Sequence, residues 1–159
     1  MLTVEERREL IHKIRLLPEE LAKAIEGLSF EQLNTPYGEG KWTVRQVVNH
    51  VADSHINGFS RMKMVVTEKH PTLKPYDQDA WAKFVDTSEH PPAAALRTLS
   101  GLHERWVAFL ESLDNETFAR TGYHPDEGDL TLDQLVKDYA RHGEKHIGHI
   151  MGLRKAKGW

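Results

Sequence analysis

Apolar residues recur every three or four positions along four long segments of the chain. This spacing is typical of helices that bury one face, so it predicts four long amphipathic helices. The segments cover about residues 4–27, 43–67, 91–113 and from 131 through the segment 139–155. No segment alternates convincingly between apolar and polar residues, as a half-buried strand would. The pattern therefore predicts an all-α protein.

Three Ser/Thr-x-x-Gln sequences mark expected helix starts, because each offers a reciprocal side-chain cap for a helix N-terminus. They begin at Ser29, Thr43 and Thr131, and the first precedes only a short turn of helix. Pro18 falls within the first long segment. Proline lacks an amide donor and clashes with the preceding turn, so a kink or a restart is predicted there. A brief helical piece is also expected near residues 79–85.

Loops are predicted where Pro, Gly, Asn and acidic residues gather, at residues 34–41, 68–81 and 121–130. The last two connections are longer than helical hairpins need, so we expect them to serve a site or to cover one end of the fold. A chain of 159 residues has the length of one domain. We therefore predict a single four-helix bundle over residues 1–159.

The composition of the chain excludes several classes of function. The net charge is −3, and lysine and arginine are spread along the chain, which argues against nucleic-acid binding. No apolar run approaches the roughly 18 residues of a membrane span, and the charged N-terminal sequence does not resemble a signal peptide. A cytoplasmic protein without membrane contact is expected. The chain has no cysteine but ten histidines, so any metal site must use histidine and carboxylate ligands.

Three histidines cluster on the last predicted helix, at His142, His146 and His149. Their spacing places them within roughly 60° of arc on the apolar face. Two imidazoles one turn apart can reach one ion at about 2.1 Å. Ordinary buried histidines are the alternative, and spacing alone does not decide which pair would bind the ion.

A further metal ligand should come from a facing helix, since sites in helical bundles are built from inward side chains of several helices. His50 lies at the edge of the apolar face of the second long helix, and Asp53 and Asn57 follow it on the same side. Asp53 could be a ligand, an orienting hydrogen-bond acceptor or a general base. A solvated or capping carboxylate is the alternative.

The other histidines are expected to have structural or surface roles. His55 is about 140° from His50 around its helix, and His103 is isolated in the sequence. His124 precedes the histidine-rich helix and could line the mouth of a site. Trp42 and Tyr76 could form a pocket wall together with Trp81, or could simply pack.

Several blocks together resemble the YfiT-type metal-dependent hydrolases of the DinB-like superfamily. The blocks, in order, are TPYGEGKWTVRQVVNHVADSHIN, PTLKPYDQDAW, LHERWVAFLESL, YHPDEGDLTL, YARHGEKHIGHI and the final KGW. The match covers about residues 30–159. It implies a four-helix bundle, one divalent ion (zinc or nickel) bound by three histidines, and a cytoplasmic homodimer.

The resemblance also implies which histidines bind. Its motifs fall on His50, His142 and His146, whereas His149 matches a position that is not a ligand. Three imidazoles leave a coordination position open, as in catalytic zinc sites. The leading hypothesis is a hydrolase in which a water activated by the ion attacks a small molecule, with Asp53 as base or orienting group.

Two alternatives stay open. Superfamily relatives include transferases and isomerases that use a low-molecular-weight thiol such as bacillithiol, and the open position could hold a thiol instead of water. The second alternative is a metal-binding bundle without catalysis, which a fourth protein ligand would favour. Asn57, His124 and His149 are expected to line the site in either catalytic case.

Overall fold

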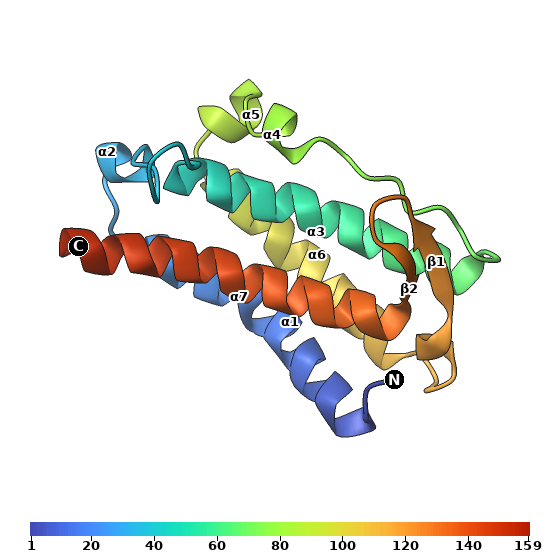
Figure 1. The fold of residues 1–159 in the computed structure, drawn as a ribbon. Coiled ribbons are helices and arrows are strands. Elements are labelled where there is room, and N and C mark those ends of the chain that lie inside the picture. Colours follow the sequence, from blue (N-terminus) through green and yellow to red (C-terminus); the bar gives the residue numbers. More distant parts are fainter.

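The computed structural model describes all residues from Met1 to Trp159. Four long helices form a bundle (Figure 1), so the prediction of an all-α four-helix fold is confirmed. They are α1 (Val4–Ile25), α3 (Val44–Thr67), α6 (Ala93–Glu111) and α7 (Leu132–Lys157). None of the helices combines the length and the apolar character that a membrane span requires.

Short elements occupy the connections between the long helices. The predicted helical piece near residues 79–85 corresponds to two helices of one turn each. The short elements are α2 (Phe30–Leu33), α4 (Gln78–Trp81), α5 (Val85–Ser88), the 3-10 helix η1 (Thr117–Ala119), β1 (Thr121–His124) and β2 (Gly128–Thr131).

Two pairs of consecutive long helices, α1 with α3 and α6 with α7, lie on the diagonals of the bundle. α1 packs against α6 and α7, and α3 also packs against α6 and α7. Figure 1 shows α1 and α7 running toward the end that carries the C-terminus, whereas α3 and α6 run the opposite way. Because α3 and α6 are parallel neighbours, the segment between them must return along the bundle, and α4 and α5 lie on this return path. The topology explains the length of the connection.

Capping boxes begin four helices: α1, α2, α3 and α7. Thr43 and Thr131 each accept a hydrogen bond from the amide three residues later, as predicted, and so does Ser29 before α2. A fourth box at Thr3, which begins α1, was not predicted although its Thr-x-x-Glu pattern is readable. At α7, the Gln134 side chain accepts a hydrogen bond from the Thr131 amide at 2.8 Å. This cap sets where the histidine-rich helix starts.

The helix α1 continues through Pro18 without a restart. Proline removes the amide that would bond the carbonyl four residues earlier, which here is Ile14. In the structure, His103 Nδ1 of α6 lies 2.5 Å from the Ile14 carbonyl oxygen and replaces the missing donor. A side chain from another helix therefore compensates for the proline.

A β-hairpin occupies the segment 121–130, which the sequence predicted as a loop. Its antiparallel register pairs Thr121 with Thr131 and His124 with Gly128. Gly128 has φ 79°, a conformation that glycine adopts without strain. Each strand has only four residues, too few for alternation to stand out from the surrounding turn formers. The hairpin lies at one end of the bundle (Figure 1), and His124 is the last residue of β1.

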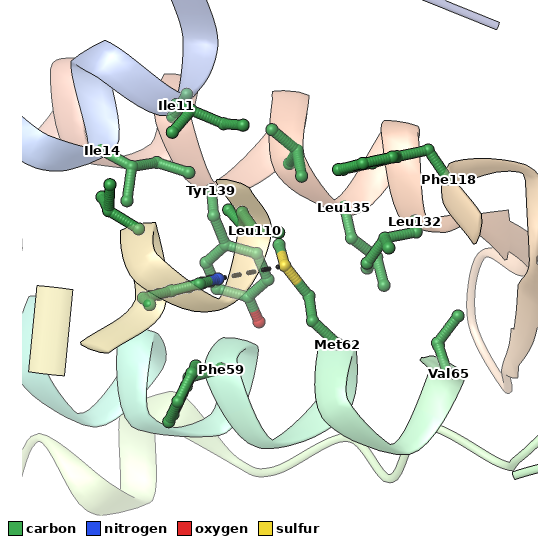
Figure 2. Packing of buried hydrophobic residues seen from close by; sticks show 14 of the residues in the cluster. Ile11, Ile14, Phe59, Met62, Val65, Leu110, Phe118, Leu132, Leu135 and Tyr139 are labelled. Carbon is green, nitrogen blue, oxygen red and sulfur yellow. Dashed lines mark hydrogen bonds between the residues drawn. The ribbon is translucent and has the colours of Figure 1, made fainter. Parts of the chain in front are cut away.

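Two apolar clusters fill the bundle. Figure 2 shows the first, in which Met62 Sδ accepts a hydrogen bond from Trp106 Nε1 at 3.2 Å. The first cluster draws on Ile14, Phe59, Trp106 and Tyr139, and the second on Leu17, Val51, Leu99 and Ile150. Along the chain, four histidines fall between members of the two clusters: His55, His103, His142 and His146. These four histidines thus lie between two apolar clusters of the bundle.

Gly143 allows α7 to approach α1 closely. An added Cβ at this position would lie 2.4 Å from Leu17 Cδ1 and 2.9 Å from Leu17 Cδ2, and the Leu17 side chain is buried. We expect Gly143→Ala to lower the free energy of unfolding by about 1–3 kcal/mol, the usual cost of overpacking a core. Urea unfolding of the metal-free protein measures the change.

Gly148→Ala on the same helix is the matched control, because nothing lies within 4 Å of its added Cβ. Alanine is a better helix former than glycine, so this variant should gain about 0.5–1 kcal/mol. Equal gains in stability for both variants would contradict the close approach at Gly143.

Candidate metal centre

Three imidazoles from two helices converge near the middle of the bundle. His142 Nε2 lies 3.2 Å from His50 Nε2 and 3.2 Å from His146 Nε2. One ligand atom from each of the three histidines lies within 4.8 Å of the other two. His50 comes from α3 and the other two from α7, so the packing of these helices forms the group.

The group fits a divalent ion. Two nitrogens that each lie about 2.1 Å from one tetrahedral ion are about 3.4 Å apart, close to the separations of His142 from its two neighbours. Burial, above all, lowers the pKa of His50, His142 and His146 to about 3. Each ring is therefore neutral at pH 7 and can offer a lone pair. The metal-ion group contains no carboxylate, which leaves coordination positions for water or substrate.

His149 lies outside this group. Its ring stacks on Tyr37 with centroids 4.3 Å apart and an interplanar angle of 10°. Spacing on the helix left open whether His142 or His149 would pair with His146. The structure brings His142 and His146 together with His50, and places His149 in the wall of a neighbouring pocket.

Asp53 lies one turn after His50 on α3, but its side-chain hydrogen bond leads to another element. Thr87 Oγ1 donates to Asp53 Oδ2 at 3.5 Å, and no hydrogen bond joins Asp53 to the three histidines. Burial, followed by the nearby Asp86, raises the pKa of Asp53 to about 6. Asn57 uses its side chain to donate to the Asp53 carbonyl at 2.8 Å and lines neither pocket beside the histidines.

Two pockets meet at His142, each with a volume of about 380 Å³. We call the first the hairpin pocket. Its lining includes Arg61, Tyr76, His124 and Asp138. His124, which the sequence suggested could line the mouth of a site, is thus part of a pocket wall that also includes His142. A molecule in the hairpin pocket would reach His142 from the side of the β-hairpin.

The second pocket, which we call the lysine pocket, also includes His142 in its lining. Its lining includes Lys41, Trp42, Lys145 and His149. Trp42 also packs on His50, with ring centroids 4.5 Å apart. Of the aromatic residues expected in a pocket wall, Trp42 and Tyr76 line the two pockets, whereas Trp81 packs on Tyr76 with centroids 4.5 Å apart.

Two histidines that the sequence suggested were structural lie directly behind the site. His55 Nε2 is 3.2 Å from His142 Nδ1, and His55 Nδ1 is 2.9 Å from His103 Nε2. On a single helix, His55 points away from His50, and His103 lies on a helix with no other histidine. Only the packing of α3, α6 and α7 shows that they connect to His142, so no local sequence signal could have found them.

Comparisons with known proteins agree with this geometry. The sequence profile described as the DinB superfamily matches residues 13–150. A Bacillus cereus strain AH820 protein, provisionally named a metal-dependent hydrolase, is 48% identical over 149 residues, which cover 94% of this chain and 86% of the relative. A Bacillus thuringiensis subsp. konkukian protein with the same provisional description shows the same identity and coverage.

Solved structures extend the comparison to three dimensions. YfiT from Bacillus subtilis, described provisionally as a metal-dependent hydrolase with an unusual four-helix bundle topology, aligns with a TM-score of 0.98 and 39% identity. The alignment covers 100% of this chain and 91% of YfiT. A mycothiol-dependent maleylpyruvate isomerase aligns with a TM-score of 0.73 at 14% identity, over 94% of this chain and 63% of its own. That second likeness concerns the fold alone.

Proposed function

This chain belongs to the DinB superfamily, and on that premise we propose that it is a metal-dependent hydrolase of a small molecule. His50, His142 and His146 would hold one divalent ion. The observation that carries the proposal is the open group of three neutral histidines at the meeting point of two pockets. The provisional names of the Bacillus relatives support the same reaction class.

The ion would polarise a substrate oxygen and lower the pKa of water. The protein supplies the surroundings. Trp42 packs against His50 and would help to hold its ring in place. Tyr76 and His124 would position a substrate that enters through the hairpin pocket.

Asp53 is the proposed general base. Its pKa of about 6 leaves the carboxyl mainly ionised at pH 7, yet close enough to neutrality to accept a proton readily. The hydrogen bond from Thr87 occupies Oδ2, so Oδ1 is the atom that would take the proton. Asp53 lies one helical turn after His50 on α3. If the substrate does not reach its carboxylate, the proton would pass to Asp53 through a water.

The two pockets favour a second candidate, a thiol S-transferase. A reaction between two molecules needs two binding places beside one centre, and both pockets include His142. A low-molecular-weight thiol such as bacillithiol would occupy one pocket, and the electrophilic substrate would occupy the other. The chain has no cysteine, so the thiol would have to come from a cosubstrate.

Turnover by stripped and reloaded protein tests these candidates. We expect hydrolysis of nitrophenyl esters or amides by protein loaded with Zn²⁺ or Ni²⁺, without added thiol, and no turnover after chelation. Asp53→Asn should keep the metal but lower kcat by about 100-fold or more, because general bases contribute about 10²–10⁴-fold. Thr87→Val, which only removes the donor to Oδ2, is the matched control and should lose far less.

Other outcomes would favour the alternatives. Turnover that strictly requires bacillithiol or glutathione would contradict hydrolysis and support the transferase. A fourth protein ligand detected by X-ray absorption of the loaded protein would contradict both reactions and favour a non-catalytic metal-binding bundle. Zinc or nickel as the ion, a homodimer and a cytoplasmic location stay predictions.

A further inference from the structure

Four polar groups form a continuous buried line from the backbone of α1 to the candidate metal centre. His103 Nδ1 lies 2.5 Å from the Ile14 carbonyl oxygen. The opposite nitrogen of His103, Nε2, lies 2.9 Å from His55 Nδ1, and His55 Nε2 lies 3.2 Å from His142 Nδ1. Both nitrogens of His103 and of His55 therefore have a partner within the line. His142 uses Nδ1 for the line, and its Nε2 faces His50 and His146.

The line has a defined direction because it begins at a carbonyl. A carbonyl oxygen can only accept, so His103 Nδ1 must carry the proton. Ile14 has this acceptor free because Pro18, four residues later, has no amide to offer it. The proline in α1 thus creates the acceptor that fixes the first histidine.

The direction passes from ring to ring, because a neutral imidazole has one donor and one acceptor nitrogen. With its proton on Nδ1, His103 accepts at Nε2, so His55 must donate from Nδ1. His55 then accepts at Nε2, so His142 must donate from Nδ1. This leaves His142 Nε2 with its lone pair directed at the centre where the ion would lie.

The surroundings keep the rings of this line neutral. His55 is 0% exposed and His103 is 1% exposed. The edges of Trp106 and Tyr139 pack around His55, with ring centroids 5.6 Å and 5.4 Å away. No carboxylate forms a hydrogen bond with any ring of the line. Burial lowers the pKa of His55 well below its ordinary value and that of His103 to about 4.

We propose that His103 and His55 are positioning residues that lock His142 in the tautomer with the proton on Nδ1 and the lone pair on Nε2. Metal-binding histidines usually donate their second nitrogen to a carboxylate, a carbonyl or water, which fixes the tautomer and orients the ring. Here His103 and His55 have that role, because they connect a backbone carbonyl on α1 to the proposed ligand on α7. The inference rests on the proposed function only in taking His142 as a metal ligand.

The tautomer of His142 can be measured in the metal-free protein by ¹⁵N NMR of the ring nitrogens. We expect a protonated Nδ1 and a bare Nε2 in the parent protein at pH 8. His55→Phe removes the acceptor beside His142 Nδ1 but retains an aromatic ring in the core. In that variant, and in His103→Phe, the proton should distribute between the two nitrogens of His142.

Metal affinity gives the second measurement, with Zn²⁺ alone as the probe. Loss of an outer hydrogen-bond partner of a ligand typically costs about 10–100-fold in affinity, and we expect a loss of that order for His55→Phe. His55→Gln is the matched rescue, because its amide can still accept from His142 and donate to His103. It should keep the parent tautomer and an affinity close to that of the parent. His12→Phe, at an exposed position of α1, controls for the loss of a histidine.

Each outcome bears on the inference. A proton on His142 Nε2 in the parent protein, or an unchanged tautomer in both phenylalanine variants, would overturn it. Unchanged Zn²⁺ affinity in His55→Phe would overturn it as well. If the parent protein shows the expected tautomer but binds no metal, the proposed function fails, whereas the tautomer lock itself stands.

Discussion

His142→Ala should abolish binding of one metal ion per chain. His142 is the central member of the group, since its Nε2 lies 3.2 Å from the nitrogens of both His50 and His146. Losing an outer-shell partner alone costs about 10–100-fold in affinity, so losing this ligand should cost more than about 100-fold. Metal content after dialysis, measured by plasma mass spectrometry together with a competition titration, reports both quantities.

His50→Ala and His146→Ala should have the same effect, because each leaves only two ligands. His149→Ala is the matched control on the same helix face. His149 stacks on Tyr37 outside the metal-ion group, so this variant should keep one ion per chain. Metal that survives the loss of His50 but disappears with His149 would contradict the ligand assignment.

Mild acid should strongly destabilise the metal-free protein. Folding lowers the pKa of His50, His142 and His146 to about 3 and that of His103 to about 4, mainly through burial. Below pH 6.5 the unfolded chain therefore binds more protons than the folded one, so stability falls as the pH drops from about 6.5 toward 3. Each neutral buried histidine costs about 1.4 kcal/mol at pH 5.5, so these four together should cost about 5–6 kcal/mol. The fully buried His55, whose pKa also lies well below its ordinary value, adds to this loss.

Urea unfolding in the presence of a chelator at pH 7.5 and pH 5.5 measures this loss. The double variant His50→Gln with His146→Gln removes two of the five imidazoles whose pKa is strongly lowered and should lose about two-fifths of the pH dependence. His12→Gln replaces an exposed histidine on α1 and is the matched control for the loss of a histidine. A parent protein equally stable at both pH values would contradict the neutral, buried state of these histidines.

Much of the fold could be predicted from local pattern. The spacing of apolar residues and the caps at Thr43 and Thr131 located the long helices, because both signals act within a few residues. The hairpin in residues 121–130 escaped prediction, since its strands are short and it is held by pairing with another segment. Tyr123 donates to the Pro71 carbonyl at 2.9 Å and accepts from the Leu73 amide at 2.7 Å. Such distant backbone partners leave little trace in the local sequence.

The sequence likewise identified some residues of the candidate site and missed others. Helical periodicity placed His142 and His146 on one face, and the family resemblance added His50. The sequence offered no reason to link His55 or His103 to them, because those two residues occupy other faces or other helices. For Pro18, the local rule predicted a kink or a restart, whereas α1 continues through the proline and His103 supplies the missing hydrogen bond from another helix.

By itself, the sequence determined the four helices, their starts, the family and the histidines that could bind a metal, because periodicity, caps and motifs are properties of neighbouring residues. The tertiary structure alone decided how those residues meet. Packing of α3 and α6 against their neighbours turns single histidines into a directed line from Ile14 to His142 and separates His149 from the metal-ion group. Hydrogen-bond direction and buried neutrality depend on partners far apart in the chain, which no local pattern specifies.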